Sequence, residues 1–155
     1  MRQILEMDVN DMTESRKIDA LLAYYGASHT NPTNELIHFI AIPLIIFSLC
    51  GLIYAASPIV LYVFLAASFV YYARLSIVFL ISMLIFSAGM LWIIQGVGSQ
   101  LVTVSVAVFI GAWILQFIGH KIEGKKPSFF EDIQYLWVGP LFVLSKLFVK
   151  FGIKW

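Results

Sequence analysis

A single charged side chain, Arg74, interrupts the stretch from Leu36 to His120. A soluble domain needs charged groups at its surface, and about a quarter of its residues usually carry a charge. Here only 12% of the residues are charged and 61% are hydrophobic. The chain is therefore predicted to be an all-α, multi-pass membrane protein that forms one domain over residues 1–155.

Turn-forming residues divide the apolar stretch into four segments. Ser57-Pro58 and the glycine-containing stretch 95–100 are typical of turns between helices. A helix needs about 17–25 apolar residues to cross a bilayer, and only the second segment falls below this length. The predicted transmembrane helices are 36–56, 58–73, 75–94 and 101–119.

The distribution of basic residues agrees with four spans. Four spans place both termini and the connection at Arg74 on the same side of the membrane, and this side then holds all 10 Lys and Arg residues. The connections at 56–58 and 95–100, on the other side, hold none. Cytoplasmic loops are enriched in Lys and Arg, so both termini are predicted to be cytoplasmic. The membrane would be a bacterial inner membrane or the endoplasmic reticulum.

Two further helical segments are predicted outside the spans. Residues 11–28 carry apolar side chains at helical spacing, which indicates a surface helix before the first span. In segment 129–155, Lys146, Lys150 and Lys154 recur every four residues among apolar ones. This pattern is typical of an amphipathic helix at the interface with anionic lipid. Membrane lipid is thus an expected partner, whereas nothing in the chain indicates a nucleic-acid partner or an oligomeric state.

The three histidines of the chain all lie where an apolar segment meets a polar one. His29 and His38 flank the start of the first span, and His120 follows the fourth. The four-span topology places all three on the cytoplasmic face, at the depth of the lipid headgroups. Asn31-Pro32 is typical of a helix N-cap followed by the first helical residue.

Amide and carboxylate side chains accompany these histidines at helical spacing. Gln116, His120 and Glu123 are spaced i, i+4, i+7, and Asn34 lies four residues before His38, so each helix end brings an imidazole and a polar partner to one face. Imidazole and carboxylate are ligands of zinc as well as of non-haem iron, and the spacing leaves both open. The alternative is a set of interfacial hydrogen-bonding residues without a metal.

Two stretches carry a resemblance to a known family. "YYGASHTNPTNELIHFIAIPL" and "QFIGHKIEGKKPSFF" resemble the paired signatures of the yeast 2-hydroxy fatty acid dioxygenase family. The resemblance extends from the helix before His29 to about Phe142. It implies an Fe(II)-dependent dioxygenase of fatty acid α-oxidation, embedded in a membrane. Such an enzyme converts a long-chain 2-hydroxy fatty acid and O2 into the fatty acid one carbon shorter, carbon dioxide and water.

The resemblance also implies roles for individual residues. The histidines of the family correspond to His29, His38 and His120, which are the expected catalytic iron ligands. Glu123 is expected to be a fourth metal ligand or an acceptor that fixes an imidazole tautomer. The remaining polar positions would orient ligands or bind the substrate carboxylate, and they are Asn31, Asn34 and Gln116. Lys121 would steer the anionic head of the substrate, although ordinary enrichment of lysine on the cytoplasmic face is the favoured explanation for it.

Other functions remain open from the sequence. A non-catalytic membrane lipid-binding or scaffold protein would use the histidines only at the interface, and no metal would copurify with it. A zinc-dependent lipid hydrolase would use the same site without oxygen. A small transporter is disfavoured, because transporters place ionisable groups near the middle of the membrane and the predicted spans have none there.

Overall fold

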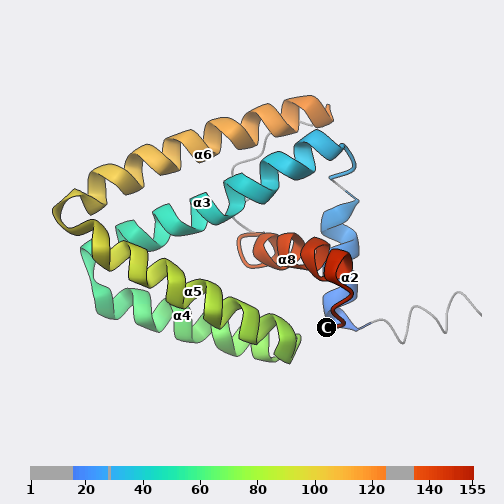
Figure 1. Ribbon diagram of the computed structural model, residues 1–155, viewed down its shortest axis with the longest axis horizontal. Coiled ribbons are helices and arrows are strands. Elements are labelled where there is room, and N and C mark those ends of the chain that lie inside the picture. The colour runs from blue at the N-terminus through green and yellow to red at the C-terminus, as the bar shows by residue number, and fades with distance from the viewer. Residues whose placement is uncertain (1–15, 28, 125–134) are drawn as a thin grey trace, which may run out of the picture.

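The computed structural model describes residues 16–27, 29–124 and 135–155 (Figure 1). Every regular element in these ranges is a helix, as the sequence predicted, and none of them contains a strand. The elements are α2 (Lys17–Gly26), α3 (Pro32–Ala56), α4 (Pro58–Ala73), α5 (Ile77–Val97), the short 3-10 helix η1 (Gly98–Gln100), α6 (Leu101–Glu123) and α8 (Val138–Phe151).

The long helices form two antiparallel pairs. α3 packs beside α6 over most of its length, and α4 packs beside α5 (Figure 1). α8 lies between the two pairs at the end of the molecule where α3 begins and α6 ends, and α2 lies across that end against α8. The beginning of α3 and the end of α6, far apart in the sequence, are therefore neighbours.

Local sequence signals set the helix ends. Asn31 caps α3, with its side-chain oxygen accepting a hydrogen bond from the Thr33 N–H at 2.9 Å, and Pro32 is the first helical residue. Gly124 ends α6 in the left-handed conformation, with φ of 76°, which glycine adopts without a steric penalty. Both features agree with the sequence patterns. α3 begins before the predicted span and α6 ends after it, so both helices continue into the polar stretches that carry the histidines.

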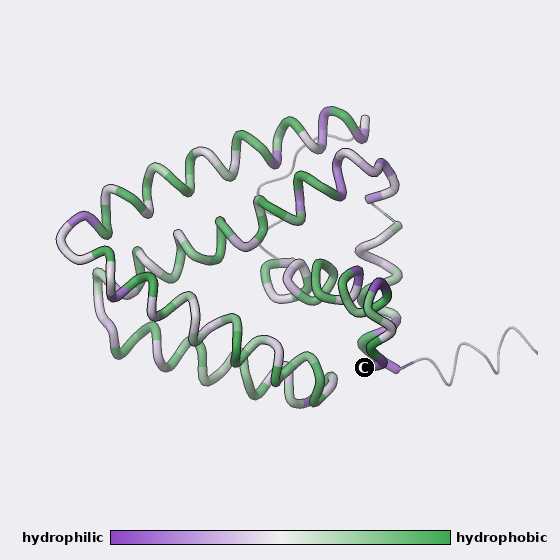
Figure 2. Tube along the Cα trace, viewed as in Figure 1, coloured by the Kyte–Doolittle hydropathy of each residue, from purple (hydrophilic) through white to green (hydrophobic). Residues whose placement is uncertain are grey.

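The surface indicates association with a membrane. The stretches Pro32–Ala56 and Ile77–Glu123 are long and apolar enough to cross a bilayer, whereas α4 is apolar but shorter. Hydrophobic residues line the lengths of α3 to α6, and hydrophilic ones gather at the two ends (Figure 2). Large apolar side chains are exposed along the outside, and Trp92 has 78% of its surface exposed. Apolar surface of this extent requires an apolar environment or a partner.

Small and polar residues form the interface between α3 and α6. The buried interface positions on α3 alternate in steps of four and three residues from Asn34 to Ser48, a spacing typical of closely paired helices. Gly119 lies so near α3 that a Cβ there would overlap Oδ1 of Asn34, and a Cβ on Gly51 would overlap Oγ of Ser105. The buried interface residues include Asn34, His38, Ala41, Ile45, Ser48 and Gly51 on α3 and Ser105, Ala112, Gln116 and Gly119 on α6.

The apolar face of α8 packs inside the molecule. Leu141, Phe142 and Phe148 belong to a core cluster with residues of α2, α3, α4 and α5. Lys146 lies on the exposed face, and its Nζ is 2.7 Å from Oε1 of Glu35. α8 is thus an amphipathic helix with its apolar side covered by the other helices, and its place at a lipid interface stays a prediction. The predicted helical residues 11–15 and 28 and the segment 129–134 lie outside the described residues.

Candidate functional site

The three histidines lie together at the end of the molecule where α2, α3 and α6 meet. The ring centroids of His29 and His38 are 4.3 Å apart, those of His38 and His120 are 5.2 Å apart, and those of His29 and His120 are 6.1 Å apart. Their exposed fractions are 5%, 0% and 8% in chain order. We call these three residues the histidine cluster.

Backbone carbonyls define the tautomers of two of these rings. Nδ1 of His29 is 2.8 Å from the Tyr25 carbonyl oxygen, and Nδ1 of His38 is 2.9 Å from the Asn34 carbonyl oxygen. A carbonyl can only accept, so each Nδ1 carries the proton and each Nε2 keeps its lone pair. The two Nε2 atoms face each other at 3.1 Å. Two lone pairs at this distance repel each other, and a shared proton or metal cation would remove the repulsion.

The distance between these nitrogens allows one shared metal ion. The separation of 3.1 Å is less than twice a metal–imidazole bond of about 2.1 Å, so an ion beside the line that joins the two Nε2 atoms could reach both. The His120 ring is the nearest third imidazole and meets His38 edge-on, with 80° between the ring planes. Within the described ranges, no three His, Cys, Asp or Glu side chains already stand around one point at metal-binding distance. The donors present are therefore an opposed pair with a third imidazole beside it.

Glu123 ties the end of α6 to the start of α3. Its Oε1 accepts hydrogen bonds from the N–H and the hydroxyl of Thr30, at 2.9 and 2.6 Å. Its Oε2 accepts bonds from the Asn31 N–H at 3.0 Å and from Nδ2 of Asn34 at 2.9 Å. Thr30 directly follows the first histidine, and the Asn34 carbonyl holds the second. The carboxylate thus fixes the backbone that carries both opposed imidazoles.

The hydrogen bonds also keep this carboxylate ionised. Burial raises the pKa of Glu123, but the bonds from Thr30, Asn34 and Asn31 outweigh it and lower the pKa from 4.5 to about 2. The donors stand at the N-terminus of α3, where the helix dipole also favours a negative charge. Glu123 is thus an anionic clamp between the end of α6 and the start of α3. All the hydrogen bonds described for it come from Thr30, Asn31 and Asn34, which follow His29 in the chain.

The two buried amides differ in their surroundings. Gln116 is 2% exposed, and its Oε1 finds no hydrogen-bond partner among the described residues. A buried acceptor without a partner costs about 1–3 kcal/mol, which indicates that a donor belongs there. Oδ1 of Asn34 is also without a partner among those residues, but it faces the backbone of Gly119.

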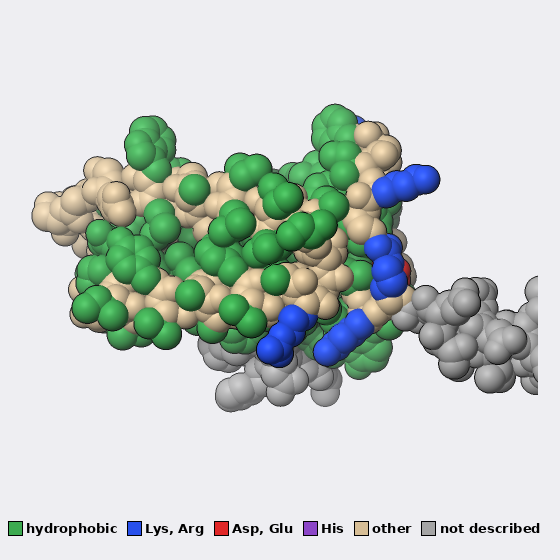
Figure 3. Space-filling model, turned by 90° about the horizontal axis from the view of Figure 1, so that it is seen from below, with side chains coloured by type: hydrophobic (Ala, Val, Ile, Leu, Met, Phe, Trp, Pro, Cys, Tyr) green, Lys and Arg blue, Asp and Glu red, His purple; other side chains and the backbone are tan. Residues whose placement is uncertain are grey.

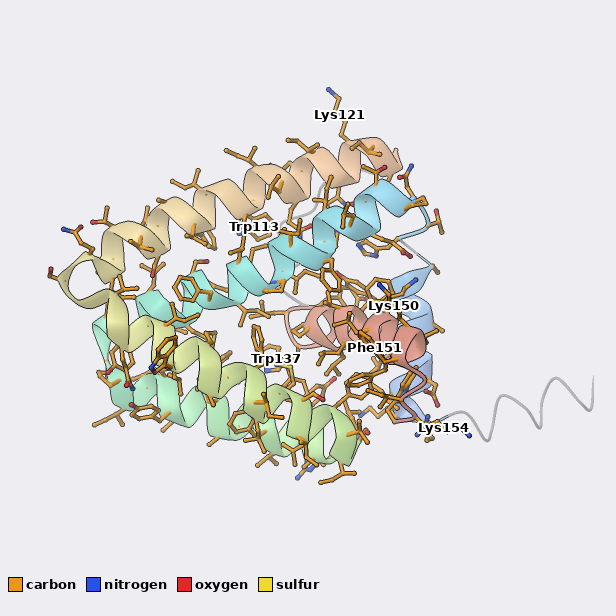
Figure 4. All side chains as sticks on the ribbon, viewed as in Figure 1. Trp113, Lys121, Trp137, Lys150, Phe151 and Lys154 are labelled. Carbon is orange, nitrogen blue, oxygen red and sulfur yellow. The ribbon has the colours of Figure 1, made fainter. Side chains whose placement is uncertain are left out.

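The remaining predicted residues point elsewhere. The side chain of Asn31 caps its own helix and does not face the cluster. Lys121 is exposed and projects outward from α6, away from α3 (Figure 4). The structure therefore brings the histidines, Asn34, Gln116 and Glu123 together and leaves the Lys121 side chain outside this group.

A pocket lies next to the histidine cluster, and we call it the near pocket. Three of its wall residues, Tyr25, Ile42 and Gln116, each lie four positions from one of the histidines. Four positions on a helix are about one turn, so Ile42 on α3 and Gln116 on α6 place the near pocket one turn from the cluster. Tyr25 also stacks on His29, with ring centroids 4.4 Å apart. Sequence reasoning missed Tyr25, although its spacing of four residues before His29 was an available signal.

Comparison with known proteins agrees with the two motifs. A family model described as 2-hydroxy-palmitic acid dioxygenase Mpo1-like matches residues 15–151 of the 155-residue chain. No curated protein and no solved structure matches the chain. The match covers nearly the whole sequence, including every residue of the histidine cluster, and the chain therefore belongs to the Mpo1-like family of 2-hydroxy-palmitic acid dioxygenases.

Proposed function

We propose that the chain is a membrane-embedded, Fe(II)-dependent dioxygenase that shortens a long-chain 2-hydroxy fatty acid by one carbon. The observation that carries this proposal is the opposed pair of buried Nε2 atoms on His29 and His38, with His120 beside them. The overall reaction, RCH(OH)COOH + O2 → RCOOH + CO2 + H2O, balances in atoms and electrons. It needs no external reductant and no second organic substrate.

The proposed iron ligands are the three imidazoles of the histidine cluster. Fe(II) bound there would supply the redox chemistry that O2 activation requires. The same donors also suit zinc, but zinc has no redox chemistry, so metal identity separates a dioxygenase from a hydrolase at this site. Low exposure of all three rings would keep bulk water away from the reacting groups.

Glu123 is proposed as a positioning residue. Glu123 was expected to be either a metal ligand or an acceptor outside the ligand set. Support for the second role comes from the four groups that donate hydrogen bonds to its carboxylate, which all belong to Thr30, Asn31 and Asn34. Ligand orientation by such outer hydrogen bonds commonly changes metal affinity by about 10–100-fold. Glu123 would thereby set the distance between the two opposed imidazoles without touching the metal.

Gln116 is proposed to recognise the 2-hydroxyl group of the substrate. Its buried Oε1 is an acceptor and therefore suits a hydroxyl donor better than the substrate carboxylate. A site built to hydrogen-bond a hydroxyl strongly rejects the analogue that lacks it. This contact would let the protein distinguish a 2-hydroxy acid from the unmodified fatty acid.

The proposed topology has α3, α4, α5 and α6 crossing the membrane, with both termini and the site on the cytoplasmic side. Support comes from the basic side chains, which gather at the end of the molecule where the C-terminus lies (Figure 3). The α3–α4 and α5–α6 connections lie at the opposite end and have no charged residue. An amphiphilic substrate would place its polar head at the cytoplasmic end and its tail between the helices.

Oxygen consumption tests the proposed reaction. Detergent-purified protein is reconstituted anaerobically with Fe(II) and given 2-hydroxypalmitate or palmitate. The expected result is uptake with the hydroxy acid only, abolished by a chelator, absent with zinc and lost in His38→Ala. Gln100→Ala, at the far end of the molecule, is the matched control and should keep full activity.

The alternatives give different results in the same assay. A zinc-dependent lipid hydrolase would release fatty acid from an ester without consuming oxygen. A scaffold protein would show neither metal binding nor turnover. No uptake by folded, iron-loaded protein would refute the dioxygenase proposal.

A further inference from the structure

We infer that the acyl chain of the substrate runs from the histidine cluster through two adjoining pockets, and that Leu136 controls how long a chain fits. The identity of the occupant rests on the proposed function. The inference extends that function to the binding of the apolar tail and to the selection of chain length, for which no residue has been assigned above.

The first segment of this path is the near pocket. It begins one turn from the histidine cluster, at Tyr25 and Gln116, and its inner wall is formed by Ile45 and Trp113. The polar atom of Gln116 thus lies toward the cluster, and apolar side chains lie farther in. A 2-hydroxy acid has the same order of chemistry along its length, with polar groups at one end and methylenes behind them.

The second segment is a larger, almost wholly apolar pocket lined by α3, α4, α5 and the residues before α8, and we call it the deep pocket. It is lined in part by Leu49, Phe69, Met83 and Met90. Leu136 lines both the near pocket and the deep pocket. Leu136 therefore stands at the junction, where it packs against the cluster that contains Ile45 and Trp113.

The depth of the deep pocket suits one long acyl chain. Leu49 follows His38 by 11 residues on α3, which is about 16 Å along the helix axis. The hydrocarbon core of a bilayer is about 30 Å thick, so the acyl chain of one leaflet occupies about 15 Å of depth. A long acid with its head at the histidine cluster would thus end in the deep pocket, whereas a short one would end before Leu136.

The polar atoms of Ser68, Tyr72 and Trp137, which form one wall of the deep pocket, are paired by hydrogen bonds. The indole N–H of Trp137 donates to Oγ of Ser68 at 2.9 Å, and the hydroxyl of Tyr72 donates to the Trp137 carbonyl at 3.3 Å. These bonds pair the polar atoms of the wall with one another. Methylene groups in the deep pocket would therefore leave no polar atom of this wall without a partner.

Two tryptophans allow the tail to be located directly. Trp113 lines the near pocket and Trp137 lines the deep pocket (Figure 4). Trp92 projects from the outside of α5 with 78% exposure and is the matched control. Variants that keep one of these three, with Phe at every other tryptophan position, report on one location each. Bromine on a bound acyl chain quenches the fluorescence of a tryptophan that it contacts.

The quenching experiment uses metal-free protein and 2-hydroxypalmitate brominated at the middle or at the end of its tail. Mid-chain bromine should quench Trp113 most, and terminal bromine should quench Trp137 most, both saturably. Trp92 should respond only as it does to brominated detergent. Equal quenching of Trp92 and Trp137, or quenching that does not saturate, would place the tail in the surrounding lipid and overturn the inference.

Substitution of Leu136 tests its control of chain length. Leu136→Trp fills the junction and should weaken binding of 2-hydroxypalmitate at least about tenfold, because several methylenes lose their buried site. Binding of 2-hydroxyoctanoate should change by less than about twofold, since its tail ends before the junction. Leu147→Trp, a half-buried position outside both pockets, is the control. Equal losses for the two acids, or none for the longer one, would refute the role of Leu136.

These measurements separate the tail site from the proposed reaction. Saturable quenching of Trp137 by brominated 2-hydroxypalmitate, together with no oxidation of 2-hydroxypalmitate by the iron-loaded protein, would refute the dioxygenase and leave the tail site in place. Turnover of 2-hydroxypalmitate without quenching of Trp137 would refute the tail site and leave the dioxygenase in place.

Discussion

Replacing Glu123 by Gln tests whether the histidine pair depends on the clamp between α6 and α3. The Glu123 carboxylate accepts hydrogen bonds from Thr30, Asn31 and Asn34 at distances between 2.6 and 3.2 Å. Glutamine has almost the same shape, but one of its two terminal atoms is a donor. Since every partner in this contact is also a donor, the NH2 group would face N–H or O–H groups and lose their bonds.

The expected loss of stability follows from these contacts. Hydrogen bonds to a charged group contribute about 1.5–3 kcal/mol each, and partial exposure of Glu123 to solvent screens part of this. We expect Glu123→Gln to lower the free energy of unfolding of metal-free protein by about 2 kcal/mol. This corresponds to a change of roughly 30-fold in the unfolding equilibrium.

The pH dependence provides a second, signed test. Hydrogen bonding lowers the pKa of Glu123 from 4.5 to about 2. A carboxyl group whose pKa is lower in the folded state stabilises the fold above the unfolded pKa, and this contribution is lost as pH falls through the folded pKa. The native chain should therefore lose this contribution between about pH 4.5 and pH 2. Glu123→Gln should lack that part of the acid dependence and be less stable already at pH 7.

Thermal unfolding in detergent and metal titration are the two assays. Glu35→Gln is the matched control, because Glu35 lies on the same end of α3 and forms one partly exposed ion pair with Lys146. Glu123→Gln should weaken metal binding by about 10–100-fold and also destabilise the metal-free protein, whereas the control should do neither to a comparable degree. If Glu123→Gln lost metal but left the metal-free protein as stable as the native chain, Glu123 would be a ligand and the clamp would be wrong.

Three further predictions concern neighbouring positions. Gly119→Ala should destabilise the protein by about 1–3 kcal/mol, since the new Cβ would overlap the amide oxygen of Asn34 on α3. Gly111→Ala on the same helix places its Cβ in open space and should be neutral or stabilise the protein by up to about 1 kcal/mol. Thermal unfolding of the two variants tests this difference. Gln116→Leu should cut the binding preference for 2-hydroxypalmitate over palmitate at least about tenfold, and an unchanged preference would exclude Gln116 from hydroxyl recognition. Lys146→Ala should cost less than about 1 kcal/mol, because the Lys146 and Glu35 side chains are 49% and 32% exposed; a larger loss in thermal unfolding would contradict a weak surface ion pair.

The helix ends could be predicted because their signals are local. Asn31 followed by Pro32 sets the start of α3, and Gly124 sets the end of α6, each through the conformation of one or two residues. Such signals do not depend on what packs against the helix. The all-α class and the positions of the histidines at the helix ends follow from the same local information.

The pairing of α3 with α6 was not predicted, because both helices are apolar on every side. Hydrophobic periodicity shows which face is buried only when the opposite face meets water. Here the large apolar side chains lie outside and small or polar ones lie between the helices, as in packing within lipid. A signal was nevertheless present: small or polar residues recur every seven positions, at 34, 41 and 48 on one helix and at 105, 112 and 119 on the other.

The hydrogen-bond partners of Glu123 could not be predicted from the sequence, for a different reason. Thr30 and Glu123 are separated by 93 residues, and helical spacing relates only residues of the same helix. The spacing of Glu123 from His120 therefore left two roles open, a metal ligand or an acceptor that fixes an imidazole tautomer, and it gave no indication that the carboxylate binds the first residues of α3. The i, i+3 relation was correct for the backbone, but it could not specify the direction of the side chain.

The pairing of α3 with α6, which the sequence pattern did not predict, also explains why Glu123 and the histidines lie close together. Small residues at the interface allow α3 and α6 to approach so closely that one carboxylate on α6 reaches the first residues of α3. Close pairing on this side leaves α8 to fill the space toward α4 and α5, and Leu136, just before α8, borders both pockets. Larger residues at the α3–α6 interface would separate the two helix ends. The clamp and the opposed imidazoles would then be lost together, while each helix on its own could still form.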